Sequence, residues 1–230
     1  MTTTLAFDVY GTLIDTHGVV DRLRALVGGR AEEFSRRWRE KQLEYSFRRG
    51  LMRAYQDFSV CTRQALDHTC LAAGAALADG DRRALLEAYR ALPAFPDAAP
   101  ALLDLRAAGF RPFAFSNGSA EAVRTLLGAA GLADLFLDVV SVDEIRSFKP
   151  DPEVYRHFLR RSGAEGESAW LVSANPFDVI GALSAGLRAA WVQRSPSAVF
   201  DPWDLSPTLT VGGLGELRGR LPGGAIGAGA

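Results

Sequence analysis

The sequence has few of the residues that build covalent or metal cross-links: its 230 residues include two cysteines and three histidines. So small and scattered a set predicts neither a disulfide framework nor a cysteine–histidine metal cluster. No apolar run approaches the length of a membrane span, and no basic segment followed by an apolar one marks a secretory signal near the N-terminus. These absences predict a cytoplasmic protein that has no membrane partner.

An excess of charge of either sign is also lacking. The chain has 26 lysines and arginines against 27 aspartates and glutamates, a formal net charge of -1. This balance gives no electrostatic basis for binding nucleic acid or an anionic membrane surface. What the chain does have is apolar content. Its 48% of hydrophobic residues suffice for the core of one large domain, or of a core domain with a smaller insert.

Strand-like and helix-like segments alternate along most of the chain. Apolar runs predict strands early in residues 1–14 and at 112–115, 136–142, 169–172 and 189–192. The long stretch from 16 to 92 instead predicts successive helices, most clearly at 31–49. This pattern predicts an α/β fold with a doubly wound, mostly parallel sheet and an inserted all-helical cap. We expect a discontinuous core domain (1–15 and 94–220), a helical cap domain (16–93) and a flexible Gly/Ala-rich tail (221–230).

Polar clusters follow the predicted strands or their neighbouring loops at four places: Asp8–Thr12, Ser116–Ser119, Lys149–Asp151 and Ser173–Asp178. The carboxyl ends of parallel strands meet at one crevice, so we expect these clusters to share a site. A carboxylate inside an apolar run is costly unless it is paired, and Lys149 is a candidate partner for Asp8.

Each cluster also has a purely structural explanation. Asp8 could be a turn carboxylate, the serines of 116–119 an ordinary polar loop, and Lys149 a surface residue. Asp151 and Asn175 each precede a proline, which is the pattern of a helix cap followed by a helix start. The order and placement of the four clusters together favour a site more than any one of them does.

The four clusters resemble the four successive motifs of the haloacid dehalogenase superfamily. Within it, the chain is similar to the L-2-haloacid dehalogenase branch at Tyr10, where related phosphatases carry a second acid, and at Trp38–Tyr45 in the predicted cap. The likeness covers about residues 4–215. It implies a hydrolytic enzyme that converts short-chain L-2-haloacids to 2-hydroxy acids through an ester on Asp8.

The resemblance also implies a role for each site residue. Asp8 is the expected nucleophile, Lys149 steers it, and Asp178, acting through Ser173 and Asn175, orients or deprotonates the hydrolytic water. Thr12 would bond Asp8, and Arg39 with Asn117 would receive the leaving halide. The residues expected to contact the substrate are Val9, Tyr10, Leu43, Phe58, Ser116, Asn117 and Phe177, with Ser116 and the backbone amides after Asp8 on its carboxylate.

Residue types discriminate between two chemistries. A halide leaves carbon without a proton, whereas a phosphatase must protonate its departing alkoxide, so Tyr10 in place of an acid favours carbon–halogen cleavage. Asp178 is the only carboxylate of its loop, a thin ligand set for magnesium, and we predict no metal and no cofactor. A magnesium-dependent phosphatase of the same fold and a non-catalytic binding protein remain as alternatives. The expected partners are a 2-haloalkanoate and water, and homodimers are common in the branch.

The chain departs from the branch at a few positions. Ala174, Pro176 and Phe177 stand where serine, alanine and tryptophan are usual, and Glu40 replaces a common glutamine. The lost tryptophan changes a pocket wall, and Glu40 would oppose an anionic substrate if it faced inward. These departures leave the substrate range and the rate open.

Overall fold

Six strands form a single parallel sheet in the computed structural model, which describes residues 2–223. The strands are β1 (Thr4–Asp8), β2 (Arg111–Ser116), β3 (Val139–Ser141), β4 (Ala169–Ser173), β5 (Arg188–Val192) and β6 (Leu209–Val211). Their order is β3-β2-β1-β4-β5-β6, and every neighbouring pair is parallel. The predicted doubly wound α/β fold is confirmed.

The central strand β1 forms because its apolar side chains are buried on both faces of the sheet. All five of its residues are buried. Leu5 and Phe7 pack into one core cluster and Ala6 into the other, as the alternation of side chains along a strand requires. A strand covered on both faces reads as a continuous apolar run, which is why the sequence signal for β1 was strong.

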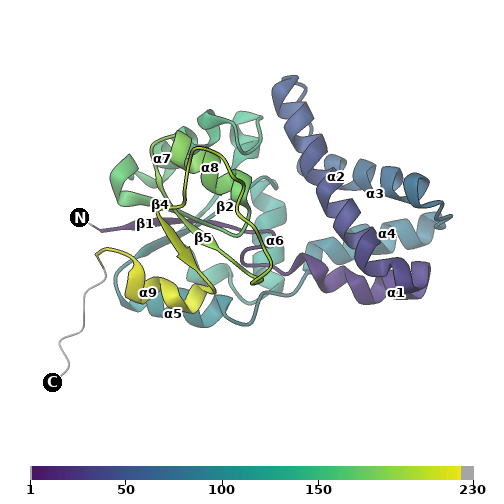
Figure 1. Cartoon of the computed structure of the whole chain (residues 1–230), viewed down its shortest axis with the longest axis horizontal. Coiled ribbons are helices and arrows are strands. Elements are labelled where there is room, and N and C mark those ends of the chain that lie inside the picture. Colours follow the sequence, from purple (N-terminus) through teal and green to yellow (C-terminus); the bar gives the residue numbers. More distant parts are fainter. Residues whose placement is uncertain (1, 224–230) are drawn as a thin grey trace.

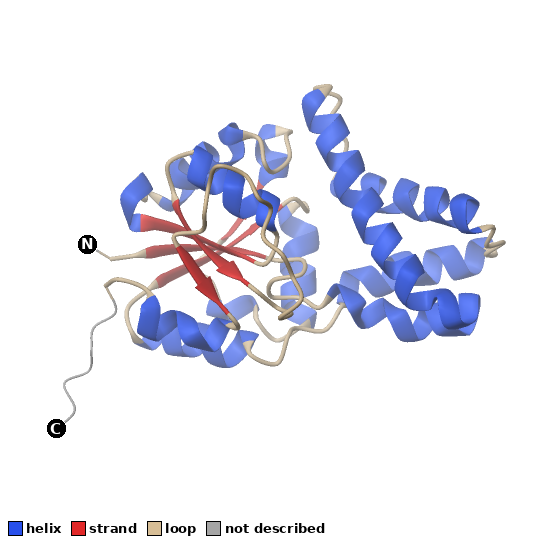
Figure 2. Cartoon of the chain, in the orientation of Figure 1, coloured by secondary structure: helices blue, strands red, loops and turns tan. Residues whose placement is uncertain are grey.

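Helices cover both faces of this sheet (Figures 1 and 2). Those that flank it are α5 (Ala98–Ala107), α6 (Ala120–Ala129), α7 (Pro152–Ser162), α8 (Pro176–Ser184) and the short α9 (Leu217–Arg220). Buried residues of α7 and α8 belong to the cluster that contains Ala6, whereas α5, α6 and α9 contribute to the cluster on the opposite face. Short 3-10 turns occur at Ala133–Leu135, Val142–Ile145, Gly166–Ser168 and Leu214–Glu216.

The chain between β1 and α5 is helical, as predicted. It contains α1 (Val20–Val27), α2 (Ala31–Leu51), α3 (Phe58–Ala73) and α4 (Asp79–Ala88), with 3-10 turns at Thr16–Val19, Gly28–Arg30 and Tyr89–Ala91. Figure 1 shows these helices gathered beyond one edge of the sheet. Phe34 and Trp38 bury one side of α2, and the Trp38 indole donates a hydrogen bond of 2.9 Å to the Thr62 carbonyl of α3.

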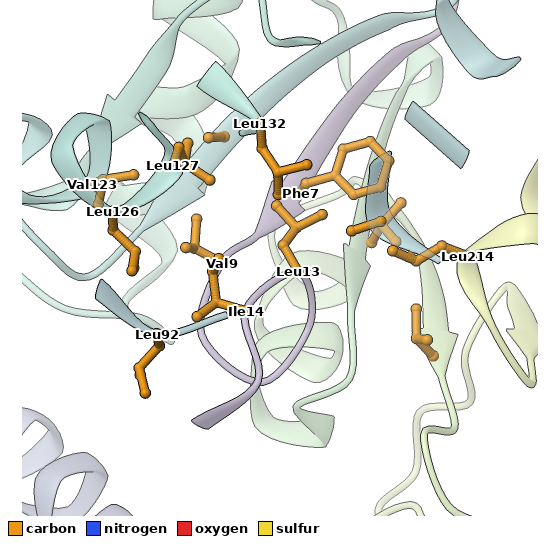
Figure 3. Packing of buried hydrophobic residues seen from close by; sticks show 14 of the residues in the cluster. Phe7, Val9, Leu13, Ile14, Leu92, Val123, Leu126, Leu127, Leu132 and Leu214 are labelled. Atoms are coloured by element: carbon orange, nitrogen blue, oxygen red, sulfur yellow. The ribbon is translucent and has the colours of Figure 1, made fainter. Parts of the chain in front are cut away.

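The helical segment leaves and rejoins the sheet through two adjacent crossings. The amide of Asp15 donates to the Pro93 carbonyl, and the amide of Phe95 donates to the Leu13 carbonyl, both at 2.8 Å. Figure 3 shows Ile14 close to Leu92 where the crossings meet. We propose the division into a core domain and a helical cap domain at these crossings, near residues 15 and 93. The paired crossings support that division.

Three details differ from the sequence-based expectations. The strand predicted at 136–142 pairs only at Val139–Ser141, because Phe136 packs edge-on against Phe7 and Val142 begins a 3-10 turn. β6 was not predicted, since three residues give no measurable period. The tail expected at 221–230 begins in the core: Leu221 is buried, and residues 224–230 lie outside the described chain. Among the described residues, no helix combines the length and apolarity needed to cross a membrane.

Candidate active site

The predicted polar clusters lie together at one edge of the sheet. Asp8, Ser116 and Ser173 are the last residues of β1, β2 and β4, and parallel strands end at the same edge. Lys149 lies on the loop after β3, and Asp178 is in the first turn of α8. All five side chains are buried. The structure therefore gathers residues that are up to 170 positions apart into one polar centre.

The two carboxylate oxygens of Asp8 have different surroundings. Oδ2 accepts hydrogen bonds from the Thr12 hydroxyl (2.8 Å), the Asn175 amide (2.7 Å) and the Ser173 hydroxyl (3.3 Å). Oδ1 accepts one from Lys149 Nζ at 3.1 Å. A carboxylate offers about four lone-pair sites over its two oxygens. Oδ2 is thus fully engaged, and Oδ1 is the oxygen that can attack a substrate.

Lys149 is a buried cation whose three donors all have acceptors. Its ammonium donates to Asp8 Oδ1, to Asp178 Oδ2 at 2.8 Å and to the Phe115 carbonyl at 2.9 Å, and the side chain is 1% exposed. Burial lowers the pKa of Lys149, but the carboxylates of Asp178 and Asp8 raise it more, so the net shift is upward. Lys149 therefore stays charged between the two acids.

Asp178 is fully buried and is held on both sides. Lys149 binds its Oδ2, and the Tyr155 hydroxyl of α7 donates to its Oδ1 at 2.8 Å. Burial raises the pKa of Asp178 to about 6, opposed by Lys149 and reinforced by the nearby Asp8 carboxylate. Burial and the neighbouring Asp178 carboxylate hold the pKa of Tyr155 well above its usual value. Tyr155 was missed from the sequence, where its apolar helical pattern is that of any core aromatic.

The predicted route from Asp178 through Ser173 and Asn175 differs from the geometry. The Ser173 hydroxyl donates to Asp8 and accepts the Asn175 amide N–H at 3.1 Å, while the Asn175 side chain bonds Asp8. Within residues 2–223, the carboxylate of Asp178 is bonded by Lys149 and Tyr155 instead. Lys149, not the serine–asparagine pair, links the two acids, because Asp178 in the first turn of α8 is directed toward Lys149 and Tyr155.

The structure separates the two candidate helix caps. Asp151 does cap α7, since its side chain accepts the Glu153 amide N–H at 2.9 Å. Asn175 occupies the same position before α8 but does not cap it, and its amide donates to Asp8 and to the Tyr10 carbonyl at 3.2 Å. Gly11 makes this approach possible with a positive φ of 85° at the turn facing Asn175. The structural explanation holds for Asp151 and fails for Asn175.

Ser116 and Asn117 stabilise the second loop and connect it to the lysine. The Ser116 hydroxyl accepts the Gly118 amide N–H at 3.1 Å. The Asn117 side-chain oxygen accepts the backbone N–H of Lys149 at 2.9 Å, and the Ser141 hydroxyl donates to the Gly118 carbonyl at 2.7 Å. Asn117 therefore fixes the backbone from which the Lys149 side chain projects.

Arg39 brings the helical segment into the site. Its guanidinium donates to the Tyr10 carbonyl and to Gln42 Oε1, both at 3.4 Å, and lies 5.9 Å from the centre of the Tyr10 ring. Glu40, the next residue, points elsewhere: its side chain is 59% exposed and pairs with Arg36 at 2.6 Å. The concern that Glu40 would oppose an anionic ligand is thus removed by the rotation of α2.

Aromatic rings form a wall where the helical segment meets the sheet. Tyr10 and Phe58 lie with ring centres 6.2 Å apart, and Phe47 of α2 meets Phe177 of α8 edge-on at 4.9 Å. Burial and the neighbouring Tyr89 raise the pKa of Tyr10 to about 12, so its hydroxyl keeps its proton. A cavity of about 560 Å³ borders Tyr10, Phe58 and Tyr89.

Two further residues expected to contact the substrate are Leu43 and Val9. Leu43 is half-buried one helical turn after Arg39 on α2. The Val9 side chain is completely buried in the core, and the Val9 carbonyl accepts the amides of Leu13 and Ile14 at 2.9 and 3.0 Å. A ligand near Val9 could therefore meet only its backbone.

The acid pair leaves little room for a metal ion. Lys149 already occupies the space between the carboxylates of Asp8 and Asp178, and Asp8 Oδ2 is saturated by neutral donors. Across residues 2–223, no group of three or more histidine, cysteine, aspartate or glutamate side chains is arranged to hold a metal. Independence from metal stays a prediction, which a chelator tests.

Comparison with known proteins places this geometry in a family. A model of haloacid dehalogenase-like hydrolases matches residues 2–186. (S)-2-haloacid dehalogenase 1 of Pseudomonas sp. (strain CBS-3) is 40% identical over 188 residues, which cover 82% of this chain and 83% of the relative. Haloacetate dehalogenase H-2 of Moraxella sp. (strain B) is 38% identical over 207 residues, which cover 90% and 92%.

A solved structure agrees with the sequence matches. L-2-haloacid dehalogenase from Xanthobacter autotrophicus, with chloropropionic acid covalently bound, superposes with a TM-score of 0.87. It is 33% identical, and the match covers 96% of this chain and all of the neighbour. The strand order, the polar centre and these matches agree, and the chain belongs to the haloacid dehalogenase-like hydrolases.

Proposed function

We propose that this protein is an (S)-2-haloacid dehalogenase, which hydrolyses short-chain L-2-haloacids to 2-hydroxy acids through an ester on Asp8. The observation that carries this function is the asymmetry of the Asp8 carboxylate, with one saturated oxygen and one free to attack. Relatives at 36–40% identity are (S)-2-haloacid dehalogenases, and the Xanthobacter enzyme was solved with chloropropionic acid covalently bound.

In the first half-reaction, Asp8 Oδ1 attacks C2 of the haloacid in line with the carbon–halogen bond. The C–O bond forms as the carbon–halogen bond breaks, and the halide leaves with the bonding electron pair and no proton. This agrees with Tyr10, whose raised pKa makes it a poor acid. Arg39, fixed by the Tyr10 carbonyl and Gln42, and Asn117 receive the halide, because a fixed cation favours developing negative charge.

In the second half-reaction, water attacks Cγ of the Asp8 ester. Oδ2 is then the carbonyl oxygen, and the three donors that it already holds (Thr12, Ser173 and Asn175) stabilise the oxyanion. Collapse breaks the bond between Cγ and Oδ1, and the departing alkoxide takes up the proton that Asp178 removed from the water. The product therefore leaves as a hydroxy acid with the Oδ1 oxygen, while Asp8 gains one oxygen from water and releases that water's second proton to solvent. Asp178 takes the water proton, and its pKa of about 6 suits a base at neutral pH.

The substrate is oriented by its two ends. Ser116 and the backbone amides of Val9 and Tyr10 bind its carboxylate in this proposal. The rings of Tyr10 and Phe58 contact its alkyl group, together with Leu43 of α2 and Phe177 of α8.

We further propose a cytoplasmic homodimer. The two cysteines, Cys61 and Cys70, are free and buried, as suits a reducing compartment. Large apolar side chains are exposed on the helical segment, where Leu51 and Leu71 are 89% and 81% exposed, and such surfaces favour association. Light scattering on the purified protein tests this: a mass near 25 kDa would contradict a dimer of the 24.8 kDa chain.

The activity is tested by halide release from each enantiomer of 2-chloropropionate with a chelator present. We expect the wild-type protein to release chloride from the (S) enantiomer and the Asp8→Asn variant to release none. Chloroacetate, which has no stereocentre, serves as a second substrate because one relative is a haloacetate dehalogenase. Phosphate release from sugar phosphates that requires magnesium, with no halide from any haloacid, would overturn the proposal.

A further inference from the structure

A second polar contact, partly buried, lies beside the crossings and away from the reacting carboxylate. Arg194 follows β5, and its guanidinium donates to Asp97 Oδ2 at 2.7 Å and to the Thr12 carbonyl. The same group stacks over the Phe95 ring, 4.1 Å from its centre. Arg194 thus contacts the returning crossing at Phe95 and Asp97 and, through Thr12, the loop that follows Asp8.

The Asp97 side chain binds Arg194 and does not cap α5. It stands at the N-cap position of α5, yet its side chain does not cap that helix. Oδ2 instead accepts the guanidinium of Arg194 and the amide N–H of Leu214 at 2.8 Å. This binds the start of α5 to the turn that precedes α9.

Stability alone does not explain the pair. Among the described residues, Asp97 Oδ1 and Arg194 Nε are buried without a hydrogen-bond partner. Leaving such atoms unpaired costs free energy that an apolar pair would not lose. The arrangement is therefore better explained by what it holds in place.

We propose that Arg194 and Asp97 are positioning residues for the nucleophile, an inference that rests on the proposed function. Arg194 fixes the Thr12 carbonyl, and therefore the direction of the Thr12 hydroxyl. That hydroxyl donates to Asp8 Oδ2 and accepts the Ala174 amide N–H, both at 2.8 Å. Arg194 is also held by Phe95 and Asp97, where the chain returns from the helical segment to the sheet. The position of the helical segment and the orientation of the Asp8 carboxylate are therefore coupled.

The first test compares Arg194→Met with Arg218→Met as a matched control. Arg218 of α9 pairs with Asp104 of α5, and this ion pair involves none of the site residues. We expect Arg194→Met to lower kcat about ten- to a hundredfold with a smaller change in KM, as a misaimed nucleophile should. Arg218→Met should match wild type. Asp97→Asn, which retains an acceptor for Leu214, should lower kcat in the same direction and serves if Arg194→Met does not fold.

A double-variant cycle then separates positioning from general loosening. If Arg194 acts through Thr12, the Thr12→Val variant has already lost the hydroxyl that Arg194 orients. Adding Arg194→Met to that variant should then lower kcat by less than twofold. Losses in kcat that multiply would overturn the proposal, because Arg194 would then act by another route. A wild-type kcat in both Arg194→Met and Asp97→Asn would overturn it equally.

Hydrogen–deuterium exchange tests the inference without any activity. The Arg194→Met variant should lose protection in a peptide covering residues 9–15, whose amides close the loop onto Val9, Ile14 and Pro93. Arg218→Met should not. Unchanged protection in Arg194→Met would overturn the positioning role even in a protein that dehalogenates, whereas lost protection in a protein that releases no halide would refute only the proposed function.

Discussion

Replacing Lys149 by methionine should destabilise the protein in a strongly pH-dependent way. The ammonium is the only cation in contact with two buried carboxylates among the described residues, and its side chain is 1% exposed. Removing one partner of a buried ion pair costs about 3–5 kcal/mol, because the remaining charge is left desolvated. Asp178, with no exposed surface, must then be buried charged or take up a proton.

Protonation of Asp178 sets the size of the loss in unfolding free energy. Protonating a carboxyl of ordinary pKa near 3.9 costs about 1.4 kcal/mol for each pH unit above that value, or about 5 kcal/mol at pH 7.5. In the variant, folded Asp178 holds a proton that the unfolded chain has lost. The folded state therefore gains stability as pH falls, and the deficit relative to wild type should shrink by about 2 kcal/mol between pH 8 and pH 6.5.

Urea unfolding of both proteins at several pH values measures this deficit. Lys41→Met is the matched control, since Lys41 is the other lysine of the chain and pairs with Glu44 on the surface of α2. It should cost no more than about 1 kcal/mol at any pH. Adding Asp178→Asn to Lys149→Met should abolish the pH dependence. A deficit for Lys149→Met below about 1 kcal/mol at pH 7.5, or one that does not change with pH, would refute the reasoning.

Three further predictions concern catalysis. The kcat for halide release should fall as pH drops through about 6, where Asp178 takes up a proton. Tyr155→Phe should move this fall to higher pH, because the variant loses the hydroxyl that favours the charged form of Asp178. A pH profile that does not move would contradict this role of Tyr155. In a single turnover in ¹⁸O-water, mass spectrometry should find the label in the peptide containing Asp8 and ordinary oxygen in the first product; label in that product would rule out attack at Cγ. Glu40→Gln should change KM for 2-chloropropionate by less than about twofold, since Glu40 is exposed and paired with Arg36; a fivefold drop in KM would mean that Glu40 faces the substrate.

Much of the fold could be predicted because its signals are local. β1, β2, β4 and β5 are mostly apolar runs whose residues are nearly all buried, and two of the helices around them, α7 and α8, begin at a proline. β6 was not predicted because a strand of three residues shows no periodicity. β3 was predicted to be longer than it is because its apolar run continues into a buried turn. The sequence therefore failed to predict how many residues pair in the short strands β3 and β6.

The sequence by itself determined the α/β alternation, the helical insertion and the loops on which Asp8, Ser116, Lys149 and Ser173 stand. Short-range patterns and the resemblance sufficed, because parallel strands always end at one edge. Only the tertiary structure decided that Lys149 bridges the two acids, that Tyr155 holds Asp178, and that Glu40 turns away while Arg39 turns inward. Such contacts join residues up to 141 positions apart. They depend on strand register and helix rotation, which packing of the whole core sets and no local pattern records.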